Sequence, residues 1–139
     1  MNYQGVGKIL NLEEPTITLQ DLMKITRRGL LKSAIDSITK LLDLSGAELA
    51  TYLHVSERTL QRYASDKELS PELSDRLVQI AKVYARAVDV FEDEENAVAW
   101  LKYPSRALND TAPIEYLDNS SGIEIVLDEL IRIEYGVVA

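Results

Sequence analysis

The chain has 139 residues, of which 46% are hydrophobic, and it carries a formal net charge of −8. This length and apolar content can build a globular core, in one domain or in two small ones that share a core. The absence of cysteine excludes disulfides and thiolate metal sites and fits a reducing cytoplasm. The amino terminus lacks a basic region followed by an apolar run, and no uninterrupted apolar stretch of about 18 residues occurs, so we expect neither an export signal nor a membrane span.

The first 42 residues predict an arm followed by two helices. Residues 1–16 mix polar side chains with Gly and Pro, and we expect a flexible or loosely docked arm. Residues 18–24 can form a short helix capped by Thr18, and residues 25–29 a connector. From residue 30 to residue 42, apolar side chains recur every three or four positions, which is typical of an amphipathic helix.

Residues 45–67, SGAELATYLHVSERTLQRYASDK, have the pattern of a helix-turn-helix. In this motif one helix crosses the DNA backbone, and a second enters the major groove after a tight turn. Apolar residues lie on one face of each predicted helix: Leu49, Ala50, Leu53, Leu60 and Tyr63. The turn has His54 where many such motifs have Gly, but His tolerates the left-handed region better than most residues, so the turn can still form.

The outward face of the second helix, which Ser56 can cap, carries groups suited to DNA. Arg pairs with guanine, Gln pairs with adenine, and Thr reaches a phosphate or a thymine methyl group. The candidate DNA-binding residues are Ser56, Arg58, Thr59, Gln61, Arg62 and Lys67. The alternative is a helical hairpin whose polar face is only solvated.

Charge is distributed unevenly along the chain. Residues 24–67 contain eight Lys or Arg against five Asp or Glu, a balance of +3, and residues 68–139 contain six against fifteen, a balance of −9. This asymmetry favours a basic DNA-facing module joined to an acidic module with another role. A balance of only +3 also implies modest affinity per copy, so we expect a dimer that binds two half-sites.

A long helix is predicted from residue 71 to residue 91, because Ser70-Pro71 is a helix-start signal and an apolar stripe follows it. The acidic run at residues 92–95 raises the question of general acid–base chemistry, for which paired carboxylates are suited. Its position before another apolar helix instead favours a role at the amino end of that helix, through the macrodipole.

Three shorter elements complete the chain. The next helix contains Trp100, interpreted as a core or interface anchor, and ends at a proline. A one-turn helix starts at Pro113, and the last helix runs from residue 121 to about residue 135, with Gly136 as its C-cap. The apolar tail at residues 137–139 has three interpretations: docking on a partner, tucking against its own core, or fraying in water.

Three segments of the second half, SPELSDRL, AVAWLKYPSRALNDTAPIEYL and SGIEIVLDELIRIEYGV, resemble the Xre/MbcA/ParS antitoxins, the partners of RES-domain toxins in type II toxin–antitoxin modules. The first half, with ERTLQRY after the helix-turn-helix, is similar to the Xre-like part of the same proteins. Together the match covers about residues 27–138. The family often has Gly-Gly where this chain has Asn109-Asp110, which is a departure in one loop.

The resemblance implies an all-α antitoxin of two parts that follow the arm expected at residues 1–16. The first part is a helix-turn-helix DNA-binding domain at residues 17–69, and the second is a helical toxin-binding domain at residues 70–139, joined to it by the long helix. It would bind the operator DNA of its own promoter as a homodimer and repress its operon. It would also neutralise a RES toxin that consumes NAD, in a higher-order complex, by covering the toxin's active site. The covering region mapped on this chain comprises Arg132, Glu134, Tyr135, Gly136, Val137, Val138 and Ala139.

One further hypothesis concerns the toxin-binding residues, and others concern alternative functions of the protein. Arg132 and Glu134 would complement charges at the toxin's nucleotide-binding mouth. Alternatively, the protein is a non-enzymatic helical adaptor, or a transcriptional regulator without a toxin partner, as the small basic excess and His54 would allow. An enzyme is disfavoured because the chain has no Gly-rich phosphate loop, no metal-ligand spacing and a single His, so we expect no catalytic residue, metal or cofactor.

Overall fold

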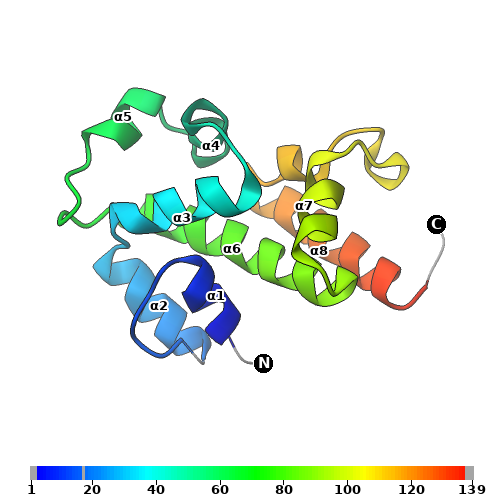
Figure 1. Ribbon diagram of the computed structural model, residues 1–139, viewed down its shortest axis with the longest axis horizontal. Coiled ribbons are helices and arrows are strands. Elements are labelled where there is room, and N and C mark those ends of the chain that lie inside the picture. Colours follow the sequence, from blue (N-terminus) through cyan, green and yellow to red (C-terminus); the bar gives the residue numbers. More distant parts are fainter. Residues whose placement is uncertain (1–2, 17, 137–139) are drawn as a thin grey trace. The chain divides into compact units, whose positions relative to one another are not determined.

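The computed structural model describes residues 3–16 and 18–136, and the chain in these ranges is built from helices (Figure 1). The predicted all-α class is confirmed: these ranges contain no strand, and Ser105 and Thr111 form an isolated β-bridge. No helix in them has both the length and the apolar character needed to cross a membrane. The chain divides into two compact units, residues 1–81 and residues 82–139.

The division falls inside one long helix, α6. In the first unit the elements are α1 (Gln4–Ile9), α2 (Leu19–Arg28), α3 (Lys32–Leu42), α4 (Gly46–Leu53), α5 (Glu57–Arg62) and the first part of α6 (Pro71–Phe91). In the second unit they are the remainder of α6, α7 (Glu94–Lys102), the 3₁₀ helices η1 (Arg106–Leu108) and η2 (Pro113–Tyr116), and α8 (Ser120–Glu134).

The amino-terminal segment, expected to be a flexible or loosely docked arm, includes the helix α1 among its described residues. Val6 and Leu10, within and just after α1, are buried. Helix α1 contacts α3, and the Ser37 hydroxyl donates to the carbonyl oxygen of Ile9 at 2.6 Å. Apolar burial and this hydrogen bond offset the conformational entropy lost when the segment is ordered.

Helix α2 starts where the sequence predicts, at a capping box. The Thr18 hydroxyl accepts from the Asp21 N–H at 3.1 Å, and the Asp21 carboxylate accepts from the Thr18 N–H at 2.9 Å. The helix then continues through residues 25–28, where the sequence analysis places a connector, so that prediction is wrong. Ile25 is buried on the same face as Leu22, and this packing extends the helix by another turn.

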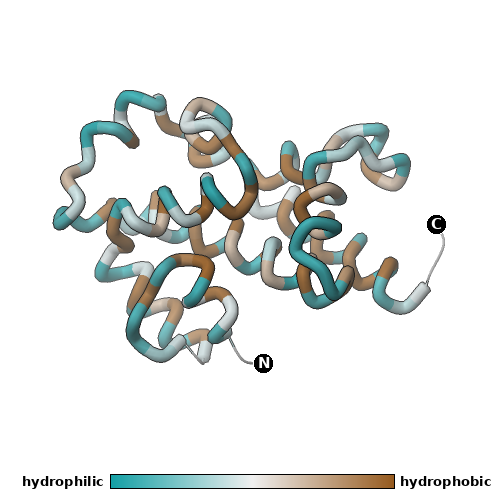
Figure 2. The backbone as a smooth tube through the Cα atoms, in the orientation of Figure 1, coloured by the Kyte–Doolittle hydropathy of each residue, from teal (hydrophilic) through white to brown (hydrophobic). Residues whose placement is uncertain are grey.

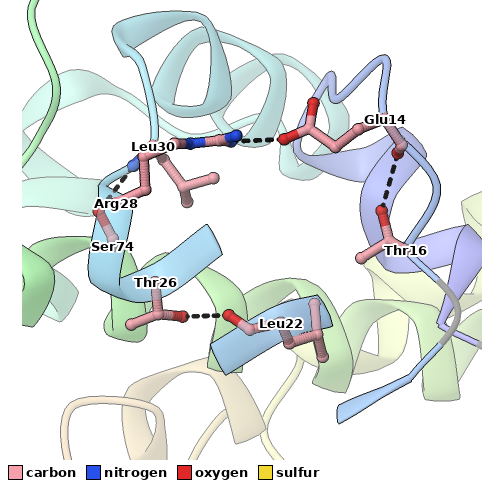
Figure 3. A network of polar contacts seen from close by, with 7 residues as sticks. All are labelled: Glu14, Thr16, Leu22, Thr26, Arg28, Leu30 and Ser74. Atoms are coloured by element: carbon pink, nitrogen blue, oxygen red, sulfur yellow. Dashed lines mark hydrogen bonds and ion pairs between the residues drawn. The ribbon is translucent and has the colours of Figure 1, made fainter. Parts of the chain in front are cut away.

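Polar contacts fix the loop after α1 and the connection between α2 and α3 (Figure 3). Arg28 pairs with Glu14, and the hydrogen bond from its guanidinium lowers the pKa of the Glu14 carboxyl group. The buried Thr16 hydroxyl donates to the Glu14 carbonyl oxygen at 3.3 Å. The Leu30 N–H donates at 2.9 Å to the hydroxyl of Ser74 in α6, whose side chain has no exposed surface. Each buried hydroxyl therefore has a partner, as its removal from water requires.

Helix α6 has the predicted bounds, Pro71 to Phe91. The Ser70 hydroxyl accepts from the Leu73 N–H at 3.2 Å, which confirms the predicted N-cap. Hydrophobic and hydrophilic residues alternate along the helix in Figure 2, as in an amphipathic helix. The buried apolar residues of α6 are Leu73, Leu77, Val78, Ile80, Ala81, Val83, Tyr84 and Ala87.

Helix α7 shows how the acidic run is used locally. The Asp93 carboxylate accepts from the Asn96 N–H at 2.9 Å and caps the helix, and Glu94 and Glu95 occupy its first turn. These positions favour negative charge because the helix dipole is positive there. The Trp100 ring of α7 lies 5.7 Å from the Phe91 ring, centroid to centroid, which is a packing contact of the second unit.

The loop between η1 and η2 explains the departure from Gly-Gly. Asn109 and Asp110 both have φ of 57°, in the left-handed region. Asn and Asp enter this region more readily than other residues with a side chain, so the loop keeps a backbone that glycine would also adopt. The Tyr116 hydroxyl of η2 donates to the Leu108 carbonyl oxygen of η1 at 3.0 Å. The two 3₁₀ helices are thereby joined.

Helix α8 packs closely against η2. Its N-cap is Asn119, whose side-chain oxygen accepts from the Gly122 N–H at 2.9 Å. A Cβ atom on residue 122 would lie 1.9 Å from the Tyr116 carbonyl oxygen. Only glycine permits this approach between α8 and η2.

Candidate functional site

The first candidate site is the helix-turn-helix formed by α4 and α5, which lie next to each other in Figure 1. Helix α4 starts with a capping box: the Ser45 hydroxyl accepts from the Glu48 N–H at 3.0 Å, and the Glu48 carboxylate accepts from the Ser45 N–H at 2.9 Å. Two otherwise unpaired N–H groups at the helix start are satisfied in this way. Its other end leads directly into the turn.

The turn is closed by a residue with positive φ, as the sequence predicts. His54 has φ 58° and ψ 37°, in the left-handed region. The Val55 N–H donates to the Ala50 carbonyl oxygen at 3.1 Å, and the His54 N–H donates to the Thr51 carbonyl oxygen at 3.3 Å. Histidine therefore occupies the place that glycine often fills, and α4 ends cleanly before α5.

Apolar side chains close α4 against α5. Leu49, Ala50 and Leu53 of α4 and Leu60 of α5 are all buried, which confirms the predicted packing faces. Tyr63 is only half-buried and follows the last helical residue, with extended backbone. Helix α5 has six residues and is too short to be stable alone, so this packing holds it in place.

Ser56 caps α5, and two of the side chains predicted to face DNA, Ser56 and Thr59, hydrogen-bond to each other. Its hydroxyl accepts from the Thr59 N–H at 3.1 Å, and the Ser56 and Thr59 hydroxyls share a hydrogen bond of 2.8 Å. The Gln61 side-chain amide donates to the Glu57 carboxylate at a long 3.5 Å. The Ser56 and Thr59 hydroxyls thus have a partner inside the molecule.

All six predicted DNA-binding residues are exposed: Ser56, Arg58, Thr59, Gln61, Arg62 and Lys67. Five of them belong to α5 or its cap, and Lys67 lies in the loop that follows. Within the described ranges neither Arg58 nor Arg62 forms an ion pair. These two guanidinium groups are the side chains of α5 best suited to base edges and phosphates. Their contact with DNA stays a prediction.

The second candidate site is the end of α8. Arg132 is exposed, and its Nη1 atom lies 3.5 Å from Oε2 of Glu129. Tyr135 follows the last helical residue and is 74% exposed. Gly136 has φ of 68°, and its N–H donates to the Ile133 carbonyl oxygen at 3.2 Å, which closes the helix end. Val137, Val138 and Ala139, which complete the predicted toxin-binding set, lie outside the described residues.

Comparison with known families and proteins matches both halves of the chain. Residues 21–82 match the antitoxin Xre-like helix-turn-helix domain, and residues 86–136 match the antitoxin Xre/MbcA/ParS C-terminal toxin-binding domain. An antitoxin Xre from Yersinia enterocolitica is 30% identical over 118 residues, which are 84% of this chain and 80% of that protein. The chain belongs to the Xre antitoxin family. It is an antitoxin with a helix-turn-helix domain followed by a toxin-binding domain.

Two other relatives of this Xre-family antitoxin extend the comparison. An antitoxin Xre from Photorhabdus laumondii is 28% identical over 127 residues, 90% of this chain and 86% of the relative. A Sphingobium protein named Prs ADP-ribosylating antitoxin is 25% identical over 129 residues, 86% of this chain and 81% of the relative. All three alignments cover both halves of the antitoxin.

Sequence reasoning missed a lysine that supports helix α5 of the antitoxin. The Nζ atom of Lys32, the first residue of α3, donates to the Gln61 carbonyl oxygen near the end of α5 at 3.3 Å. A cation at the carboxy-terminal end of a helix satisfies an unpaired carbonyl and complements the dipole. The two residues are 29 positions apart, and no spacing rule in the sequence links them.

A second missed residue is Arg86 of α6, which pairs with Glu134 of α8. Arg86 Nη2 donates to Glu134 Oε1 at 2.6 Å. Glu134, which was expected to complement a charge on the toxin, therefore already has a partner inside the antitoxin.

In the described ranges no group of three or more His, Asp or Glu side chains is arranged to hold a metal ion.

Proposed function

We propose that this Xre-family antitoxin binds and neutralises a RES-domain toxin and represses its own operon through α4 and α5. The observation that carries the DNA-binding part is the exposed pair of arginines on α5, Arg58 and Arg62, held on a helix whose opposite face is packed against α4. This is the arrangement that a helix needs to read a major groove. We assign DNA binding to residues 17–69, and toxin binding to residues 70–139.

The DNA proposal is tested with a duplex that carries the promoter of the antitoxin's own operon. The variant Arg58→Gln or Arg62→Gln should bind it more weakly, by about 1–3 kcal/mol for an arginine that reads a guanine. An arginine that contacts a phosphate should instead lower the slope of log affinity against log salt by about 1. Arg106→Gln is the control, since Arg106 is an exposed arginine in the second unit. Unchanged affinity and slope in both α5 variants would show that the helix-turn-helix does not read DNA.

Toxin neutralisation is assigned to residues 132–139, which we call the C-terminal segment. The support is the exposed Tyr135 at the end of α8, followed by the apolar residues Val137, Val138 and Ala139. A short apolar and aromatic segment suits insertion into a concave, water-filled site on a partner. We propose that it covers the active site of a toxin that consumes NAD. The name of the Sphingobium relative, Prs ADP-ribosylating antitoxin, refers to ADP-ribosylation and supports a toxin of this chemistry.

Co-expression with a RES-domain toxin, followed by size exclusion with light scattering, tests the toxin proposal. The full-length antitoxin should form a stable complex and restore growth, and the chain without residues 132–139 should fail in both. Rescue by both forms would assign neutralisation to another surface. Failure of both forms to bind would favour a regulator or adaptor without a toxin partner.

We further propose that the antitoxin acts in the cytoplasm as a homodimer, without a cofactor or catalytic activity of its own. Dimerisation is supported by the modest basic excess, +3 over residues 24–67, because two half-sites would add their phosphate contacts. Light scattering of the free antitoxin gives the assembly state directly. Incubation of the purified protein with NAD, followed by chromatography, should show no conversion.

A further inference from the structure

The last turn of α8 is joined to α6 by an ion pair that spans 48 positions of the sequence. Arg86 Nη2 donates to Glu134 Oε1 at 2.6 Å, and both residues belong to the second unit. The two side chains retain 26% and 30% of their exposure, so the pair is partly removed from water. Hydrogen bonds between charged groups are stronger than those between neutral groups, and partial burial reduces their screening.

The surroundings of Arg86 hold this pair together. The hydrogen bond to Glu134 raises the pKa of Arg86, and the negative charge of Asp89 adds to the effect. Neighbouring Arg132 lies against Glu129 and not against Glu134. Glu134 is thus already bound, through Oε1, to a residue of another helix.

The backbone after Glu134 is also closed by hydrogen bonds. The Tyr135 N–H donates to the Ile131 carbonyl oxygen at 3.1 Å, and the Gly136 N–H donates to that of Ile133 at 3.2 Å. Backbone hydrogen bonds to carbonyl oxygens of α8 therefore hold the chain up to Gly136, two residues beyond the last helical residue. Whatever holds Glu134 also sets the position of Tyr135 and the point at which the chain leaves α8.

We infer that Arg86 is a positioning residue for Tyr135 at the end of α8: it acts through Glu134, and within the C-terminal segment Glu134 itself does not contact the toxin. This inference rests on the proposed function, in which the C-terminal segment enters the toxin. A preorganised segment binds more tightly because less entropy is lost on association. Loss of the ion pair should therefore weaken toxin binding although the toxin-contacting side chains are unchanged.

The test measures the affinity of the full-length antitoxin for the RES toxin by calorimetry. Arg86→Glu and Glu134→Arg should each weaken binding about fivefold, the size expected for the loss of a partly exposed pair. The double variant, with both charges exchanged, should recover most of the loss. Arg106→Glu is the matched control, since it makes the same charge change on an exposed residue of the same unit. If Glu134 contacted the toxin directly, the double variant would not recover the affinity.

A second measurement separates positioning from general stability. In a chain that carries Tyr135→Ala, Arg86→Glu should cause no further loss of affinity, because the side chain that it positions is absent. A full additional loss there, or no effect of Arg86→Glu on the complete chain that binds toxin, would overturn the inference. If the unaltered antitoxin binds no RES toxin, the proposed function itself fails, so the two failures are distinguishable.

Discussion

At the scale of single residues, backbone contacts decide which helical glycines could be replaced by a residue with a side chain. Gly122 is buried, and the place of its missing Cβ lies 1.9 Å from the Tyr116 carbonyl oxygen. A Cβ atom on Gly5 of α1 would have no heavy atom within 4 Å apart from its chain neighbours and the backbone of its own helix. Both glycines lie in helices, so they differ in surroundings and not in secondary structure.

Gly122→Ala should therefore destabilise the protein by about 1–3 kcal/mol, because α8 or η2 must move to admit a methyl group. Gly5→Ala is the control and should stabilise by up to about 1 kcal/mol, as expected when alanine replaces glycine inside a helix. Urea unfolding followed by circular dichroism measures both values. Equal stabilities of the two variants would show that the contact between α8 and η2 is loose.

At the scale of elements, helix α5 depends on groups outside it. Ser56 supplies a hydroxyl to its first turn, Lys32 supplies an ammonium group to its last turn, and Leu60 packs against α4. A helix of six residues has too few internal hydrogen bonds to offset nucleation. Its order is therefore a property of the whole first unit.

Ser56→Ala should lower stability by about 1 kcal/mol and weaken binding to promoter DNA, because the cap of α5 is lost. Ser56→Asp is the matched variant, since aspartate also caps helices and should keep the stability near that of the original protein. Chemical unfolding and a mobility-shift titration give the two quantities. If Ser56→Ala leaves stability unchanged, then packing alone orders α5.

At the scale of the whole molecule, charge separates the two units. Residues 1–81 carry ten Lys or Arg against eleven Asp or Glu, a net charge of −1, and residues 82–139 carry five against twelve, a net charge of −7. In the proposed function, attraction to DNA would therefore depend on the local surface around Arg58 and Arg62 and not on the net charge of either unit. The acidic unit is suited to a partner with basic groups.

The stability of the whole protein should fall at alkaline pH in a way that depends on Tyr84. This tyrosine is 4% exposed; burial raises the pKa of its hydroxyl, and the negative charge of Glu94 adds to the shift. The unfolded tyrosine ionises at about pH 10. Because the folded pKa is the higher one, the contribution to stability is complete below about pH 10 and is lost as the pH rises towards the folded pKa.

Tyr84→Phe should consequently flatten the alkaline part of the stability profile, since phenylalanine has no proton to lose. Urea unfolding of both proteins at several values between about pH 8 and pH 11 measures this. The original protein should lose more free energy of unfolding over that range than the variant. If the free energy of unfolding falls equally with pH in both proteins, groups other than Tyr84 cause the loss of stability at alkaline pH.

The local features of this antitoxin follow from neighbouring residues, and the sequence predicts them well. Ser70-Pro71 marks the start of α6, Thr18 caps α2, and the apolar spacing places α4 against α5. The sequence predicted that the helix begun at Thr18 ends at residue 24, before the polar residues that follow. In the structure α2 continues to Arg28, because Ile25 is buried. Tertiary packing there outweighed the local signal.

By itself the sequence determined the all-α class, most helix boundaries, the turn at His54 and the exposed arginines of α5, because caps and helical periodicity act over a few residues. Only the tertiary structure decided which distant groups meet. Lys32 reaches Gln61, Leu30 reaches Ser74, and Arg86 reaches Glu134 across 29, 44 and 48 positions. The packing of helices in space decides such partners, and no local pattern of residues predicts which residues so far apart in the sequence will meet.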